Sequence, residues 1–445
     1  MNIEKLQQLY KEKTLTPREY MKQIKENIEA HAENPIWIYV LSESELEPYL
    51  AKLESCKVES LPLYGIPFAI KDNIDLEGVA TTAACEEYSY IAEKSAYVVQ
   101  KLIEAGAIPV GKTNLDQFAT GLVGTRSPYG ACQNSIDPKY ISGGSSSGSA
   151  VSIALDMAIF SLGTDTAGSG RVPAAFNNLV GLKPSKGVLS TSGVVPACRS
   201  LDCVSIFAKT TEDTQKVFDV AASFDAEDPY SRPMPVIEKN VPSSFRFAIP
   251  KEDQLKFFGD SEAEALYRKA VKTFEEMGGT AVEIDFSPML EAANLLYYGP
   301  WVAERYVAVK EMIETMPERL IDVTRTIIES GKTKSAEDYF NAEYKIKAYK
   351  RQGDLLMKEI DFALTPTTGT IYTIEEVNAD PIQLNTNLGY YTNFMNLLDF
   401  SAYAVPAGFR ENGLPFGVTL FADAFEDRKL MELGESYIQK ASHGK

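Results

Sequence analysis

Two glycine- and serine-rich loops are the part of this sequence whose residue types could do chemistry. The first loop covers residues 143–150 and the second covers residues 163–171, with an apolar run between them. Glycine allows backbone conformations that expose N–H groups, and serine offers a nucleophile or a proton relay. A flexible linker could share the composition of the first loop, but the apolar run predicts a buried segment. The two loops therefore indicate a serine nucleophile.

The histidine content limits what could activate such a serine. The chain has two histidines, His31 and His443, and both lie near its ends. A Ser-His-Asp hydrolase needs a histidine beside its nucleophile, so we expect another base. Lysine is the next candidate, although its free pKa of ~10.4 must fall to near neutrality through desolvation or positive neighbours. Lys71 ends an apolar run at residues 63–70 and is placed for such desolvation.

Three blocks in this order and spacing resemble the amidase signature family. They are Lys71-Asp72-Asn73, the Gly-Gly-Ser-Ser-Ser-Gly of residues 143–148 and the Gly-Thr-Asp-Thr-Ala-Gly-Ser of residues 163–169. The last block departs from the family pattern at Ala167, where most members have glycine. Each block alone is a weak signal, whereas the three together are strong, and the resemblance spans about residues 20 to 430.

The resemblance implies a catalytic triad. Ser169 matches the family nucleophile, and Ser145 matches a relay serine whose preceding peptide bond is cis in the family. Lys71 matches the general base that takes the nucleophile's proton through Ser145. A cis non-proline peptide costs ~3–4 kcal/mol, so it persists only where the fold enforces it.

The second loop also suggests how a developing oxyanion would be stabilised. Backbone N–H groups of Thr166, Ala167 and Gly168, beside the start of a helix, could supply preorganised donors. Alanine at position 167 keeps the N–H group that this role requires. Asp165 and Arg171 could be catalytic charges, but a bracing role within the loop is favoured.

Three further blocks are similar to the allophanate hydrolases of this family. They cover residues 114–126, 197–205 and 296–306. Allophanate is a small ureido amide that ends in a carboxylate, and a carboxylate is best recognised by a bidentate arginine. These dispersed blocks favour allophanate over other amides.

The resemblance implies that Tyr297 and Arg305 hold the substrate carboxylate and that Gly121 contributes a backbone contact. Gly299-Pro300 predicts a helix start, with Arg305 on the second turn. Without the resemblance, Arg305 beside Glu304 would be interpreted as a surface ion pair.

The implied reaction is hydrolysis of the terminal amide of allophanate (urea-1-carboxylate) through an acyl-enzyme, with release of ammonia during urea degradation. A biotin-dependent urea carboxylase would supply the substrate, and no cofactor is implied. Alternatives are an amidase acting on carboxybiuret or malonamide-like substrates, the glutaminase component of a tRNA amidotransferase, and a non-catalytic partner in a urea-degrading complex. Many relatives carry an additional C-terminal domain, which we expect this chain to lack.

Two other patterns, a phosphate-binding motif and the cysteines, are interpreted as structural and not as functional sites. Residues 106–113 fit the phosphate-binding pattern Gly-x4-Gly-Lys-Thr, but a predicted helix precedes Gly106 and the intervening residues predict a strand, so we reject a P-loop. The five cysteines lack metal-ligand spacing, and we expect reduced thiols and no metal site.

Composition excludes several classes of function. The net charge of −18 argues against a nucleic-acid surface. The N-terminus has no apolar signal core, and no apolar run is long enough to span a membrane. We therefore expect a cytoplasmic protein without nucleic-acid or membrane partners, and a homodimer is the family expectation.

The elements that must position these residues alternate between strand and helix. This alternation predicts an α/β fold with a mixed β-sheet between helical layers, which is also the fold that the resemblance implies. We expect one amidase domain over residues 1–445, with an N-terminal helical segment at about 1–60 and a helical insertion at about 290–360. Strands are predicted at 63–70, 107–110, 157–162, 188–195, 205–208, 245–249, 361–364, 403–406 and 417–421.

Overall fold

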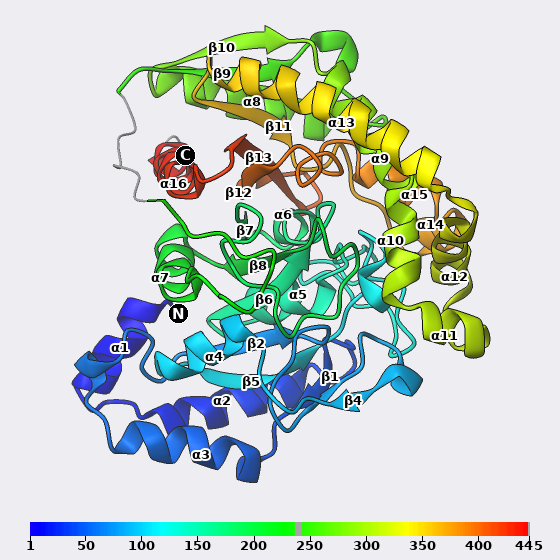
Figure 1. The fold of residues 1–445 in the computed structure, drawn as a ribbon. Coiled ribbons are helices and arrows are strands. Elements are labelled where there is room, and N and C mark those ends of the chain that lie inside the picture. Colours follow the sequence, from blue (N-terminus) through cyan, green and yellow to red (C-terminus); the bar gives the residue numbers. More distant parts are fainter. Residues whose placement is uncertain (236–242, 444–445) are drawn as a thin grey trace.

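The computed structural model describes residues 1–235 and 243–443, and an eleven-stranded mixed sheet runs through it (Figure 1). The strand order is β1-β5-β2-β6-β8-β7-β12-β13-β11-β9-β10. In that order the strands are Trp37–Val40, Ile108–Thr113, Pro67–Lys71, Phe160–Asp165, Cys203–Ala208, Val180–Lys183, Phe400–Phe409, Pro415–Asp423, Phe362–Pro366, Phe245–Pro250 and Gly279–Ile284. Parallel pairing joins β2 to β5 and β6, and joins β9 to β10 and β11. The predicted mixed α/β sheet is confirmed.

Helices cover the sheet in two layers. One layer is formed by α4 (Tyr97–Glu104), α7 (Thr211–Ala221), α8 (Ser261–Glu276) and α16 (Asp427–His443), which contact one another and the strands beneath them. The other layer contains α5 (Ser147–Ala154), α6 (Val172–Phe176) and α13 (Ala336–Met357). Because helices cover both faces of the sheet, the strand sequences are apolar runs and do not alternate between apolar and polar residues.

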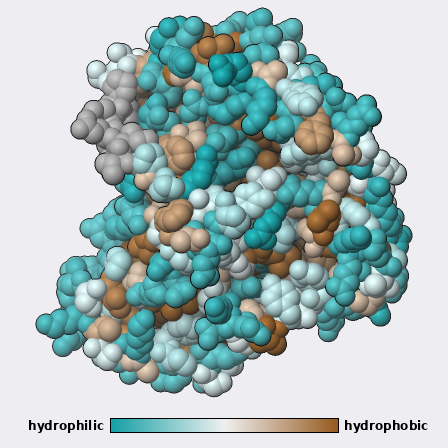
Figure 2. Space-filling model, viewed as in Figure 1, coloured by the Kyte–Doolittle hydropathy of each residue, from teal (hydrophilic) through white to brown (hydrophobic). Residues whose placement is uncertain are grey.

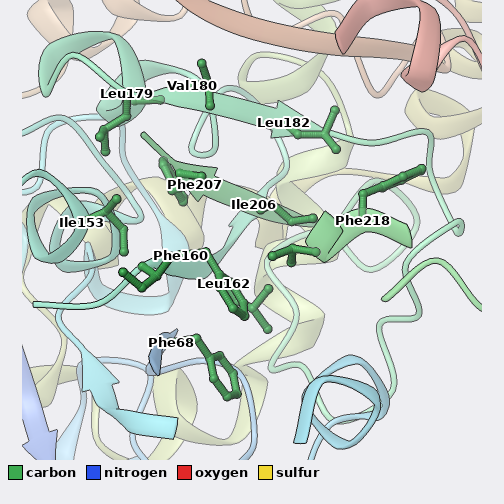
Figure 3. Packing of buried hydrophobic residues seen from close by; sticks show 14 of the residues in the cluster. Phe68, Ile153, Phe160, Leu162, Leu179, Val180, Leu182, Ile206, Phe207 and Phe218 are labelled. Atoms are coloured by element: carbon green, nitrogen blue, oxygen red, sulfur yellow. The ribbon is translucent and has the colours of Figure 1, made fainter. Parts of the chain in front are cut away.

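A large buried cluster lies where β2, β6, β7 and β8 meet these helices. Figure 3 shows the side chains of Phe68, Phe160 and Phe207 gathered in this region with leucine and isoleucine neighbours. The Phe68 and Phe160 rings stack with centroids 5.2 Å apart. Each such buried side chain contributes roughly 1.5–3 kcal/mol. This packing fixes the ends of β2 and β6, which lead into the candidate site.

The N-terminal segment is helical except for one strand. It contains α1 (Ile3–Lys11), α2 (Pro17–Ala30) and α3 (Glu43–Glu54). A capping box starts α2, since the Thr16 and Glu19 side chains each accept the other residue's backbone N–H. Strand β1 lies between α2 and α3 and pairs antiparallel with β5 at the edge of the sheet, which the helical prediction for this segment missed.

The strand predicted at residues 188–195 is wrong. The segment forms turns, with Gly187 and Gly193 in the left-handed region at φ +75° and +78°. Its polar groups bond to carboxylates instead of to a strand, as the Ser190 Oγ does to Asp225 and the Thr191 N–H does to Asp228. The other predicted strands are confirmed, with small shifts at their ends.

The region from about residue 290 to 360, predicted as a helical insertion, is helical in the structure. It consists of α9 (Ser287–Tyr297), α10 (Trp301–Ala308), α11 (Lys310–Thr315), α12 (Asp322–Glu329) and α13, followed beyond β11 by α14 (Ile374–Ala379) and α15 (Gln383–Leu388). In Figure 1 these helices lie together along one side of the molecule. Over residues 1–235 and 243–443, no helix has the length and apolarity needed to cross a membrane.

Candidate active site

Lys71 is the last residue of β2, and its side chain is fully buried. Its Nζ donates to Ser145 Oγ and to Thr164 Oγ1, each at 2.7 Å. Burial lowers the pKa of Lys71 to about 7, and the nearby Arg305 acts in the same direction, while Asp116, Asp202 and Asp165 partly oppose it. An amine of this pKa, in contact with hydroxyl groups, can accept a proton near neutral pH.

Ser145 lies two residues before the start of α5, and its hydroxyl is buried beside Lys71. The Gly144–Ser145 peptide bond is cis. The neighbouring Ser146 ties this loop to β6, because its Oγ donates to the Thr164 carbonyl at 3.1 Å and accepts the Thr164 N–H at 3.3 Å. The two glycine- and serine-rich loops predicted from sequence therefore lie against each other.

Ser169 lies between β6 and α6 and is almost fully buried. Its Oγ donates to the Gly121 carbonyl at 3.5 Å. The loop around it is braced by Asp165 and Arg171, whose carboxylate and guanidinium form two contacts of 2.9 Å. Burial alone would raise the pKa of Asp165, but Arg171, Lys183 and the Gly168 N–H together more than offset this, and the pKa lies below its ordinary value. The geometry matches the bracing role that we favoured for this pair.

The candidate oxyanion donors differ in their availability. The Gly168 N–H donates to Asp165 Oδ1 at 2.8 Å, so it is already engaged. Within residues 1–235 and 243–443, no hydrogen bond occupies the N–H groups of Thr166, Ala167 or Ser169. The available donors of this loop are therefore those three groups.

Arg305 lies on the second turn of α10, as predicted, and Tyr297 ends α9. Arg305 is buried, not part of a surface ion pair, and Glu304 instead accepts from Ser200. The Arg305 Nη1 donates to the Ala119 carbonyl at 3.2 Å, and its Nη2 donates to the Tyr297 hydroxyl at 3.4 Å. The buried Arg305 Nε has no partner.

A short segment connects Arg305 to Ser169. Arg305 bonds to Ala119 and to the Thr120 Oγ1 at 3.2 Å, while Ser169 bonds to Gly121. Residues 119 to 121 span at most about 7 Å between Cα atoms. The Arg305 guanidinium and the Ser169 hydroxyl thus approach opposite ends of one tripeptide, at a separation suited to a small molecule.

A cavity of about 610 Å³ lies beside these residues and is lined by Tyr297, Arg126, Asn393 and others. Arg126 is buried, donates to the Thr120 carbonyl at 2.8 Å and leaves its Nε without a partner. The Oδ1 of Asn393 also has no partner. Sequence reasoning missed both residues. Arg126 ends the matched block at residues 114–126, and this was its available signal, whereas Asn393 had no such signal.

The lysine of the rejected phosphate-binding pattern has a structural partner. Residues 108–113 form β5, and the Lys112 Nζ lies 3.0 Å from Asp72 Oδ1 with both side chains fully buried. Within the described part of the chain, no group of three or more His, Cys, Asp or Glu side chains could hold a metal ion. The five cysteines are free thiols.

Comparison with known proteins matches residues 19–431 to the family described as Amidase. The chain is 49% identical over 414 residues to a urea amidolyase from Lachancea kluyveri, covering 92% of this chain and 22% of that protein. It superposes on the crystal structure of the Kluyveromyces lactis allophanate hydrolase with a TM-score of 0.93 and 45% identity, covering 97% of this chain and 72% of that one. One component of the glutamyl-tRNA(Gln) amidotransferase from Heliobacterium modesticaldum is 34% identical, covering 84% of this chain and 83% of that protein.

Proposed function

Because the chain belongs to the amidase family, we propose that it hydrolyses the terminal amide of allophanate and releases ammonia. The similarity to a urea amidolyase and to an allophanate hydrolase supports this substrate over other amides. The chain spans about a fifth of the urea amidolyases that it matches, 22% in each case. The proposal therefore concerns the amide-cleaving reaction alone.

The proposed reaction begins at Ser169. Its Oγ attacks the terminal carbonyl carbon while its proton passes through Ser145 to Lys71, whose low pKa suits it to this role. The tetrahedral oxyanion would be held by the free N–H groups of Thr166, Ala167 and Ser169. The C–N bond then breaks, and ammonia leaves with the proton returned by the relay.

Water completes the proposed cycle. It attacks the acyl carbon of the Ser169 ester, gives its proton to the same relay and releases N-carboxycarbamate and free Ser169. No cofactor enters either half-reaction. A urea carboxylase would form the substrate in urea degradation, and we expect the enzyme to act in the cytoplasm as a homodimer.

The observation that carries the substrate proposal is the environment of Arg305. Among the described residues no carboxylate lies within 4 Å of its guanidinium, which is buried with one N–H unpartnered. Burying a cation without a counter-ion is costly, and a substrate carboxylate would provide that counter-ion. The Tyr297 hydroxyl adds a donor beside it, and Gly121 supplies a backbone carbonyl at the other end of the substrate.

The proposal is tested by ammonia release from allophanate, with malonamide, biuret and glutamine as competing substrates. We expect release from allophanate and a loss of at least about 10³-fold in kcat for Ser169→Ala. Preferential use of malonamide or biuret would keep the amidase chemistry and contradict the substrate. Preferential use of glutamine would favour the amidotransferase alternative, and inactivity towards all four would favour a non-catalytic partner.

Arg305→Lys is the sharper test of substrate recognition. Lysine keeps the charge but cannot form two parallel bonds to a carboxylate. We expect kcat/KM for allophanate to fall about 100-fold, mostly through KM, while any activity on neutral malonamide changes little. An equal loss on both substrates would assign Arg305 a purely structural role.

A further inference from the structure

A second cavity lies apart from the cavity beside Arg126 and Tyr297 and has an unusual charge for this chain. It measures about 430 Å³ and is bordered by the turns after β7, by α13 and by the segment after α15. The face drawn in Figure 2 is largely hydrophilic, and the chain as a whole carries a net charge of −18. Against that background the cavity, which we call the cationic pocket, is lined by two carboxylates, Asp202 and Asp399, and by five basic residues: Lys186, Arg199, Arg232, Lys347 and Lys350.

Three of these five cations are neutralised within the protein. Arg232 forms two bonds to Asp399, at 2.8 and 2.9 Å. Lys350 lies 3.3 Å from Asp423 Oδ1, and Lys347 pairs with Glu343 on the surface of α13 at 3.5 Å. These residues need no further partner.

The other two cations, Lys186 and Arg199, are unpaired. Neither side chain makes a hydrogen bond or a contact within 4 Å to a carboxylate anywhere in the described chain, although Arg199 lies over the ring of Tyr230 with Cζ 6.0 Å from the centroid. Lys186 is largely withdrawn from water, and this burial lowers its pKa. The fully buried Lys183 adds positive charge nearby. An anion in the pocket would offset the cost of the partly buried Lys186 ammonium, which the Asp399 carboxylate compensates only in part, whereas Arg199 is exposed to solvent.

We propose that the cationic pocket binds a small oxyanion, a phosphate or carboxylate group, between the Lys186 ammonium and the Arg199 guanidinium. Arginine and lysine are the side chains that most often bind such groups, arginine through its planar fork and lysine as a point charge. The cationic pocket shares no lining residue with the cavity beside Arg126 and Tyr297, and the proposed anion site does not depend on the proposed reaction.

The position of Arg199 links this pocket to the amidase site. Arg199 belongs to residues 197–202, a segment inside one of the sequence blocks to which the proposed reaction assigns no role. In the same segment the Asp202 carboxylate accepts from the Thr166 Oγ1 at 2.5 Å, and the Ser200 N–H and Oγ donate to Glu304 at 2.8 and 2.7 Å. The segment that carries Arg199 therefore contacts both the loop of Ser169 and the helix of Arg305. Binding of an anion at Arg199 should for this reason change KM for the amide substrate.

Calorimetric titration with inorganic phosphate, and separately with citrate, tests the site and distinguishes the two anion classes. We expect saturable binding of one of them to the unmodified protein and at least tenfold weaker binding to Lys186→Met and Arg199→Gln. Lys345→Met is the matched control, because Lys345 is an exposed lysine of α13 that does not line the pocket. Lys186→Met breaks no hydrogen bond, and Lys186→Arg, which restores the charge, should restore binding.

Two results would overturn the proposal. One is the absence of saturable binding of either anion at tens of millimolar concentration in a protein whose thermal unfolding is normal. The other is equal affinity of Lys186→Met and Lys345→Met for the anion. The link to the amidase site is tested separately, by the effect of the anion on KM. The anion should shift KM in the unmodified enzyme and in Lys345→Met. A KM shift that persists in Lys186→Met would refute the link without affecting the binding result.

Discussion

Two buried lysines on adjacent strands have very different surroundings. Lys71 ends β2 and Lys112 lies on the parallel neighbour β5, where it pairs in register with Ile70. Both side chains are fully buried. The Lys112 Nζ lies 3.0 Å from the Asp72 carboxylate, whereas the Lys71 Nζ contacts only the hydroxyls of Ser145 and Thr164 among the described residues.

This difference in contacts is the reason that Lys71, and not the equally buried Lys112, is the proposed general base. A contacting carboxylate stabilises the charged amine and offsets desolvation, so Lys112 serves as a structural cation. Lys71 lacks such a contact, and its pKa falls to about 7. The comparison can be tested by removing each amine in turn.

Removal of the Lys71 amine should have the largest effect on activity. We expect Lys71→Met to lower kcat on allophanate by about 10³- to 10⁴-fold, because a general base contributes on that order. Its unfolding free energy at pH 6 should be unchanged or higher, since the buried charge is lost with no carboxylate left unpaired. Chemical denaturation and steady-state kinetics check both parts, and a large loss of stability would contradict the contrast with Lys112.

Removal of the Lys112 amine should act on stability instead. Lys112→Met leaves the buried Asp72 carboxylate without its cation, which typically costs about 3–5 kcal/mol. Denaturant unfolding measures this loss. Adding Asp72→Asn to the same chain should recover part of it, since no charge then remains. A Lys112→Met protein of normal stability would show that the ion pair contributes little.

The roles of these two lysines could be predicted from sequence only in part. The apolar run before Lys71 and the glycine- and serine-rich loops are local signals, and the elements that they predict are confirmed. The ion pair of Lys112 with Asp72 joins residues that are far apart in the chain, so no local pattern predicts it. The glycines near Lys112 resemble a phosphate-binding loop, which is a different role for this lysine. The predicted helix before Gly106 and the predicted strand after it were sufficient to reject the phosphate-binding loop.

Side-chain partners supplied by distant segments account for the remaining errors. Residues 188–195 are apolar enough to suggest a strand, but carboxylates from residues 225 and 228 bind their polar groups and hold them as turns. Arg126 and Asn393 approach one cavity from segments more than 250 residues apart. Such convergence depends on the sheet order, which no local pattern encodes.

The pH dependence should separate the two lysines further. Lys71 must be neutral to accept a proton, so kcat/KM should rise about tenfold per pH unit below a midpoint near pH 7 and then level off. The free energy of unfolding should also depend on the protonation of Lys71. The unfolded chain, with a lysine pKa of ~10.4, binds more protons than the folded chain between about pH 7 and that value, so stability rises with pH there. Lys71→Met should lack this rise, whereas Lys112→Met should retain it.

The smallest expected effect concerns the carboxylate that acts most strongly on Lys71 without touching it. Asp116 opposes the lowering of the Lys71 pKa, and its carboxylate accepts the N–H groups of Val123, Gly124 and Arg126. Asp116→Asn keeps the shape of this residue and removes its charge, so the acid midpoint of kcat/KM should move to lower pH, by less than about one unit for a charge acting at a distance. Asp202→Asn, which removes the next carboxylate in order of influence, should move the midpoint in the same direction by less. A midpoint that moves to higher pH in either variant would mean that the titrating group is not Lys71.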